Sequence, residues 1–110
     1  MTVNEILQDP QFELVSELPK DSVKIEGYYV GDLLSYVMAK ASKGQLWLTV
    51  QAHPNVLAVA SLLELSAVMV VEDADIPQET IQTAKEKGII LMKTACTAVE
   101  ALKSLFDWEQ

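Results

Sequence analysis

Three short and almost wholly apolar runs dominate the second half of this sequence. They occupy positions 46–50, 67–71 and 89–92. Such runs, without alternation of polar residues, are typical of strands that are covered on both faces. A helical pattern follows each run, so that strand and helix alternate along the chain. This alternation predicts an α/β fold with three layers, in which helices cover both faces of a mainly parallel sheet.

Turn and capping residues set the expected limits of the helices. Asp32 is expected to cap a helix that places Leu33, Val37 and Met38 on its inner face and stops at Gly44. Pro54 suits the first turn of a second helix over 54–65, which is apolar around more than half of its circumference.

Two further helices are expected near the end of the sequence. Pro77 and Gly88 bound the first of them. Thr97 and Glu100 form a capping box for the second, whose expected inner face is Val99, Leu102, Leu105 and Phe106.

The first part of the chain has a different pattern. Thr2 and Glu5 form another capping box, which predicts a short helix that ends near Pro10. A β-like run follows at 12–15, the stretch 22–26 alternates like an edge strand, and 28–30 favours a brief strand. We therefore expect one domain over residues 1–110, in which 1–22 form an N-terminal helix and short strand and 23–105 form the core.

Composition excludes several classes of function. Sixteen acidic residues against eight basic ones give a net charge of -8, which disfavours nucleic acid and membrane surfaces as partners. One cysteine and one histidine allow neither an internal disulfide nor a structural zinc site. The first ten residues lack the features of a secretory signal, so we expect a cytoplasmic protein.

The polar residues after the predicted strands are the candidates for a ligand site. Ligands of open α/β sheets bind beyond the carboxyl ends of the strands. The loop after the 46–50 run is the richest in polar groups, although such groups also satisfy the backbone of a tight turn. The candidates are Asp32, Thr49, Gln51, His53, Asn55, Glu72, Thr94 and Thr97.

No catalytic residues are predicted. The sequence lacks a nucleophile elbow, a phosphate-binding loop and a dinucleotide fingerprint. Cys96 precedes a helix start that favours a reactive thiol, but a small, inert residue is the commoner case. The acidic stretch 72–75 lacks the glycine and distal glutamate of a calcium loop, so a solvated turn is favoured over a metal site. No metal site is predicted and the cofactor is unknown.

Three stretches of this sequence resemble a DRTGG domain. They are Gly31-Asp32-Leu33-Leu34-Ser35, the loop and helix start from Thr49 to Val56 continuing over 58–62, and the stretch 80–94. The resemblance spans roughly 23–105. The DRTGG string itself is absent, and Val71-Glu72-Asp73-Ala74-Asp75 stands where a glycine-rich turn is expected.

The resemblance implies a fold similar to the N-terminal domain of HPr kinase/phosphorylase, dimer contacts, and regulation rather than catalysis. Related domains also occur in phosphotransacetylases and between CBS modules of pyrophosphatases, and stand-alone versions occur near hydrogenase components. We therefore expect a non-catalytic regulatory or small-ligand-sensing domain that responds to nucleotides and is linked to energy or redox metabolism. The alternative is an adaptor for a protein partner such as a redox-enzyme subunit, without a small ligand. An enzyme that uses His53 ranks third.

A homodimer is also expected from the residues themselves. The helix over 54–65 has more apolar positions than one buried face needs, and Trp108 lies close to the end of the sequence.

Overall fold

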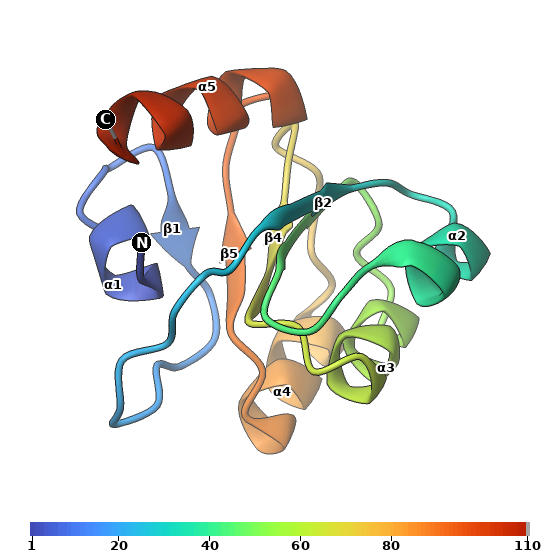
Figure 1. The fold of residues 1–110 in the computed structure, drawn as a ribbon. Helices are drawn as coiled ribbons and strands as arrows, with labels where there is room; N and C mark the ends of the chain where they lie inside the picture. Colours follow the sequence, from blue (N-terminus) through green and yellow to red (C-terminus); the bar gives the residue numbers. More distant parts are fainter. Residues whose placement is uncertain (110) are drawn as a thin grey trace.

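The alternation of apolar runs and helical stretches folds into the predicted three-layer α/β domain. The computed structural model describes residues 1–109, and their side chains as far as 107. In chain order, its elements are α1 (Val3–Ile6), β1 (Glu13–Leu14), β2 (Tyr28–Val30), α2 (Leu34–Lys40), β3 (Leu46–Thr49), α3 (Asn55–Leu62), β4 (Ala67–Val70), α4 (Gln78–Lys87), β5 (Leu91–Lys93) and α5 (Ala98–Glu109), drawn in Figure 1.

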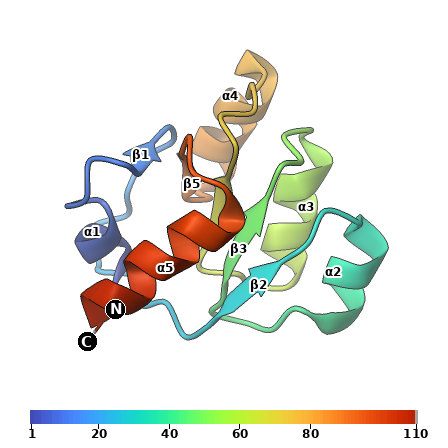
Figure 2. The same ribbon diagram turned by 90° about the horizontal axis from the view of Figure 1, so that it is seen from above.

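The sheet has the strand order β1-β5-β4-β3-β2. The pairs β2–β3, β3–β4 and β4–β5 are parallel, and β1 adds to β5 in the antiparallel direction. Three successive crossovers thus step across the sheet in one direction. Because such crossovers are right-handed, α2, α3 and α4 all lie on the same face. Helix α5 follows β5 and covers the opposite face together with α1, and Figures 1 and 2 show it crossing the end of the sheet.

The central strands divide their side chains between two hydrophobic cores. Leu46 and Leu48 of β3 contribute to the core beneath α1 and α5. Trp47, between them, contributes to the core beneath α2, α3 and α4. Every residue of β3 and β4 is buried, as expected for strands that are covered on both faces.

The N-terminal segment agrees with the prediction except at 22–26. Thr2 and Glu5 form the expected capping box at α1, and β1 lies within the predicted run. The stretch 22–26 is not a strand: it forms a single bridge between Lys24 and Thr2. The backbone of Val23 and of Ile25 pairs with the first residues of the chain, and that of Glu26 pairs with Gly44. A continuous ladder with one neighbour therefore does not form.

Two of the predicted helix faces are partly wrong. Leu33 and Met38 were expected on the inner face of the second helix, but Leu33 is 60% exposed and Met38 is also exposed. On α5, Leu105 is buried as predicted, whereas Val99 is 78% exposed, Phe106 is also exposed, and Ala101 takes an inward position. The helix ends agree better. Gly88 ends α4 in the left-handed conformation, and Thr97 with Glu100 forms the capping box of α5.

In the part of the chain that the structure describes, no helix combines the length and the apolar character that a bilayer span requires.

Trp47 links the core to the first loop at the carboxyl edge of the sheet, and its replacement tests this link. Its side chain is fully buried, and Nε1 donates a hydrogen bond to the Gly31 carbonyl oxygen at 2.8 Å. Trp47→Phe removes this donor and leaves a cavity, so we expect the free energy of unfolding to fall by about 2–4 kcal/mol. Urea denaturation measures the loss. Tyr36→Phe, at an exposed position, is the control, and an equal loss in both variants would contradict the argument.

Candidate functional site

Three of the predicted residues form a polar brace between the loops after β2 and β3. Oδ1 of Asp32 accepts hydrogen bonds from Oγ1 of Thr49 and from the backbone N–H of Val50, both at 2.9 Å. Nε2 of Gln51 donates to the carbonyl oxygen of Asp32 at 3.1 Å. The sequence predicted that Asp32 caps α2. In the structure Asp32 instead joins two loops, and Leu33 occupies the cap position.

His53 and Asn55 stabilise the start of α3 locally. Nδ1 of His53 accepts a hydrogen bond from the backbone N–H of Asn55 at 3.1 Å. The carbonyl oxygen of Ala52, beside them, accepts a hydrogen bond from Thr80 of α4 at 2.7 Å. These contacts correspond to the alternative in which polar residues satisfy the backbone of a tight turn.

The turn after β4 has the backbone conformation of a glycine-rich turn without glycine. Glu72 has φ 61° and Asp73 has φ 56°, both in the left-handed region. Two backbone bonds hold this turn over the end of β5: Glu72 N–H donates to the Cys96 carbonyl oxygen at 2.8 Å, and Asp73 N–H donates to that of Thr94 at 3.0 Å. The surrounding structure therefore maintains an unfavourable conformation at the position where the resemblance expects glycines.

Thr94 and Thr97 lie in the segment that the Glu72-Asp73 turn covers. Oγ1 of Thr94, which is buried, accepts a hydrogen bond from the backbone N–H of Cys96 at 3.2 Å. Thr97 is occupied by the capping box of α5, in which its Oγ1 accepts from Glu100 N–H. The eight predicted residues therefore form separate groups and do not converge on one pocket.

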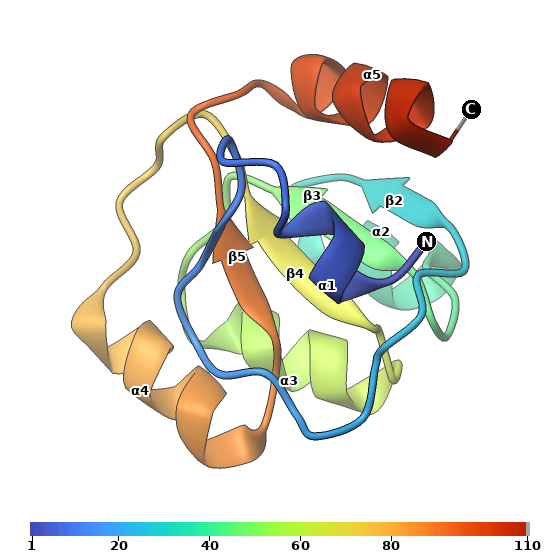
Figure 3. The same cartoon turned by 90° about the vertical axis from the view of Figure 1, so that its left-hand side faces the viewer.

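The topology of the sheet places the expected ligand crevice at β4 and β5, one strand away from the polar loop after β3 that the sequence favoured. In an open α/β sheet, a ligand crevice forms where the connections after two neighbouring strands leave toward opposite faces. The connections after β2, β3 and β4 all lead to helices on one face, whereas that after β5 leads to α5 on the other. The carboxyl ends of β4 and β5 thus flank the crevice, and Figure 3 shows the segment after β4 looping outward and down toward α4.

Two adjoining hollows occupy this position, and together we call them the edge groove. The inner hollow, of about 280 Å³, is lined by Val15, Asp73, Ala74, Asp75, Ile76, Ile81 and Lys93. The outer hollow, of about 220 Å³, is lined by Pro10, Gln11, Glu13, Asp73, Lys93, Thr94 and Ala95. Asp73 and Lys93 line both, so the two hollows adjoin at these residues.

The edge groove is lined by aliphatic side chains and by charged groups of both signs. Its aliphatic side chains come from the segment after β1, the segment before α4, and α4 itself. Nζ of Lys93 lies 3.9 Å from a carboxylate oxygen of Glu13, and both side chains are largely solvated. Asp73 and Asp75 add two carboxylates that can accept hydrogen bonds from a ligand. Such a groove can hold an apolar ring while its polar groups orient the ligand.

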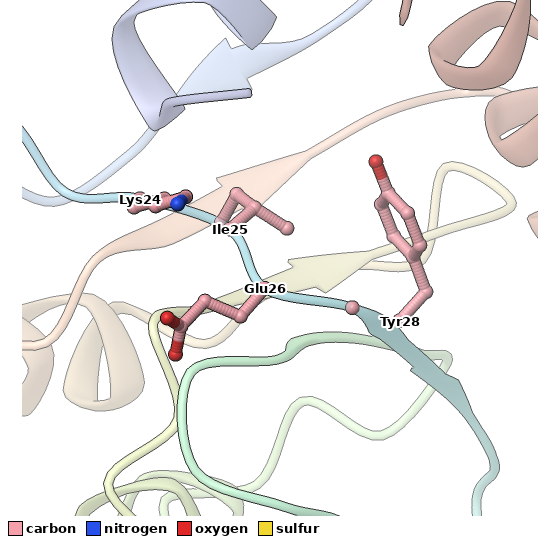
Figure 4. A pocket seen from close by; sticks show the side chains of 5 residues that line it. Lys24, Ile25, Glu26 and Tyr28 are labelled. Carbon is pink, nitrogen blue, oxygen red and sulfur yellow. The ribbon is translucent and has the colours of Figure 1, made fainter.

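Three other hollows lie outside this crevice. One follows the stretch that leads into β2 and is shown in Figure 4, with Ile25 and Tyr28 beside the side chains of Lys24 and Glu26. A second lies on α5 and is mostly apolar, and a third lies toward the amino ends of the strands, near Gly88. The first and third are at the amino side of the parallel strands, where this class of sheet does not bind ligands.

The remaining chemical groups are engaged in local contacts. Sγ of Cys96 donates to Oε1 of Gln11 at 3.2 Å, so the thiol joins the segment before α5 to the segment after α1. Among the residues that the structure describes, no group of three or more histidine, cysteine, aspartate or glutamate side chains is arranged to hold a metal ion.

Most residues of the edge groove are not among the eight candidates that the sequence suggested. Of the eight candidates, Thr94 is the one that lines a hollow named above, within the described part of the chain. Lys93 had a detectable signal, because it is the first charged residue after the apolar run 89–92. Val15 and Glu13 had none, because the antiparallel addition of β1 to β5 brings them there from the start of the chain.

The polar brace predicts that Thr49 matters for stability. Thr49→Val keeps the shape of this buried side chain but removes its bonds to Asp32 and to the N–H of Gln51. We expect the free energy of unfolding to fall by about 1–2 kcal/mol, measured by urea denaturation. Thr49→Ser keeps the hydroxyl and should lose less. A Val variant as stable as the natural chain would show that the brace contributes nothing.

The left-handed conformation of the Glu72-Asp73 turn predicts that a glycine substitution there stabilises the protein. Glu72→Gly should raise the free energy of unfolding by about 0.5–1 kcal/mol, because the relief of backbone strain exceeds the added entropy of the unfolded chain. Thermal unfolding measures the gain. Glu79→Gly, in the first turn of α4, should instead destabilise the protein. Destabilisation by both substitutions would refute the strain argument.

Comparison with known proteins identifies the fold. No protein-family model and no curated protein matches this sequence. A solved structure of the CBS and DRTGG domains of the regulatory region of Clostridium perfringens pyrophosphatase, complexed with its activator diadenosine tetraphosphate, is similar, with a TM-score of 0.75 and 16% identity. The match covers 93% of this chain and 44% of that one, so this chain spans less than half of its neighbour. The predicted α/β fold with a mainly parallel sheet is therefore confirmed, and the similar structure contains a DRTGG domain, the family that the sequence resembles.

Proposed function

We propose that this protein is a non-catalytic regulatory domain that binds a small ligand of the nucleotide class in the edge groove. The similar structure belongs to a regulatory region and was solved with a nucleotide activator, which supports both parts of the proposal. His53, the residue of the third-ranked enzyme hypothesis, accepts a hydrogen bond at Nδ1 from the backbone N–H of Asn55.

The observation that carries the proposal is the position of the edge groove. It lies at the carboxyl ends of β4 and β5, whose following helices cover opposite faces of the sheet, and it extends to β1. This is the place where open α/β sheets bind their ligands. Its aliphatic side chains, its lysine and its carboxylates are groups that contact the base, phosphate and sugar of a nucleotide.

A thermal-shift and calorimetric series tests the proposal. The probes are adenosine, AMP, ADP, ATP and diadenosine tetraphosphate. A ligand at 100 times its Kd stabilises the folded state by about 2.7 kcal/mol, which raises the Tm by about ten degrees for a domain of this size. We expect at least one probe to produce a saturable shift.

A bulky side chain locates the binding site. Ala95 is exposed and lines the outer hollow, so Ala95→Trp should block the edge groove and abolish the shift without disturbing the core. Ala39→Trp, at an exposed position of α2, is the matched control and should bind normally. The absence of a shift with every probe would refute the nucleotide proposal, and full binding by Ala95→Trp would refute the location.

The exposed face of α5 supports a second role, self-association. Val99 is 78% exposed and Phe106 is 45% exposed, and with Leu102 they line a mostly apolar hollow. The ring of Phe106 packs edge-on against Tyr28 at 5.3 Å between centroids, which holds this face in place. The excess of apolar residues on α3 no longer favours a dimer, because Val56, Leu57, Val59 and Ala60 are buried in the chain's own core. The side chain of Trp108 lies outside the described residues.

Sedimentation analysis tests the dimer. We expect the natural chain to dimerise and Val99→Glu to be monomeric, since a charge would have to be buried in the contact. Leu62→Glu, at an exposed position on the opposite side of the sheet, should leave the dimer intact. A monomeric natural chain would contradict self-association and favour the adaptor alternative, in which a different protein covers this face.

A further inference from the structure

The exposed face of α5 carries charges as well as apolar side chains. The residues that line its hollow are Val99, Leu102, Lys103, Phe106 and Asp107, and we call them the α5 stripe. Their spacing of three or four positions places them on one side of the helix. Figures 1 and 3 show α5 at the surface of the fold, with no other element of the described chain on its outer side. The stripe is therefore accessible to a partner.

The α5 stripe holds one positive and one negative charge that are not paired within the chain. Lys103 and Asp107 are both exposed and lie about one helical turn apart. Neither belongs to an ion pair among the residues that the structure describes. The stripe is thus electrically neutral, although the chain as a whole has a net charge of -8. Two acidic molecules can approach each other here with less repulsion than at their acidic surfaces.

The order of these residues makes the α5 stripe complementary to a second copy of itself. A contact about a two-fold axis brings residue i of one copy to residue j of the other, and j to i. With the axis near Ser104, antiparallel helices place Leu102 opposite Phe106 of the second copy. Lys103 then lies within about 3 Å, along the helix axis, of the level of Asp107 of the second copy. A lysine side chain spans this offset, so two identical ion pairs form.

A partner with charges of one sign fits the α5 stripe less well. A basic surface would attract Asp107 but repel Lys103, and an acidic surface would do the reverse. A second copy matches both charges and offers apolar side chains of its own, because Val99 is 78% exposed and Phe106 is 45% exposed. The charge pattern and the apolar residues thus favour the same occupant.

We propose that two copies of this chain associate through antiparallel α5 helices, in which Lys103 of each copy pairs with Asp107 of the other and Leu102 packs against Phe106. This proposal rests on the self-association proposed above and specifies its contact. The ring of Phe106 is held edge-on by Tyr28 at 5.3 Å between centroids. It therefore enters the contact with little further loss of side-chain freedom.

Charge reversal tests this pairing by sedimentation analysis at low salt. Lys103→Glu leaves two acidic charges on the stripe, and Asp107→Lys leaves two basic ones. Because like charges then face each other, we expect each variant alone to raise the dissociation constant of the dimer about tenfold. An equimolar mixture of the two variants should form a heterodimer about as tight as the natural dimer, since an acidic stripe then faces a basic one. Salt at about 0.5 M should reduce these differences.

Two exposed residues outside the α5 stripe supply matched controls. Lys40→Glu on α2 and Glu86→Lys on α4 change the net charge by the same amounts. Both should dimerise like the natural chain. Normal dimers in both stripe variants, or no recovery on mixing them, would overturn this pairing and leave self-association standing. A monomeric natural chain would instead refute self-association itself, and this pairing with it.

Discussion

The burial of β3, β4 and β5 between two cores is the constraint on which the other features depend. Because both faces of these strands are apolar, helices must cover the sheet on both sides, and short parallel crossovers supply them on one side only. The second face is left for α1 and α5, the elements at the two ends of the chain. This division puts opposite-facing connections after β4 and β5, and it thereby creates the crevice between them.

Local patterns in the sequence predicted the elements well. The apolar runs gave the strands, and Pro54, Pro77, Gly88 and the two capping boxes gave the helix ends to within a few residues. The failures concern which side of an element is buried. Val99 and Leu33 are apolar and correctly spaced, but both are exposed, as are Met38 and Phe106 further along the same two helices. The spacing of apolar residues alone does not show which of them another part of the chain covers.

The candidate site was harder to predict than the fold because it depends on contacts between distant segments. The polar loop after β3 was correctly placed at the carboxyl edge of the sheet. However, Asp32, from the preceding connection, accepts hydrogen bonds from the side chain of Thr49 and the backbone of Val50, so these groups are already engaged within the chain. The edge groove depends on β1 lying beside β5, a pairing between residues about eighty positions apart. The similarity to HPr kinase, the cytoplasmic location and the link to redox enzymes stay predictions from the sequence.

The strained turn at Glu72 and Asp73 has a consequence for the local dynamics of the protein. Its two backbone N–H groups bond to the carbonyl oxygens of Thr94 and Cys96, which belong to the next connection along the sheet. Neither amide can exchange its hydrogen with solvent unless these bonds open, and the left-handed backbone favours opening. The amide exchange of Glu72 and Asp73 therefore reports the separation of the connections after β4 and β5.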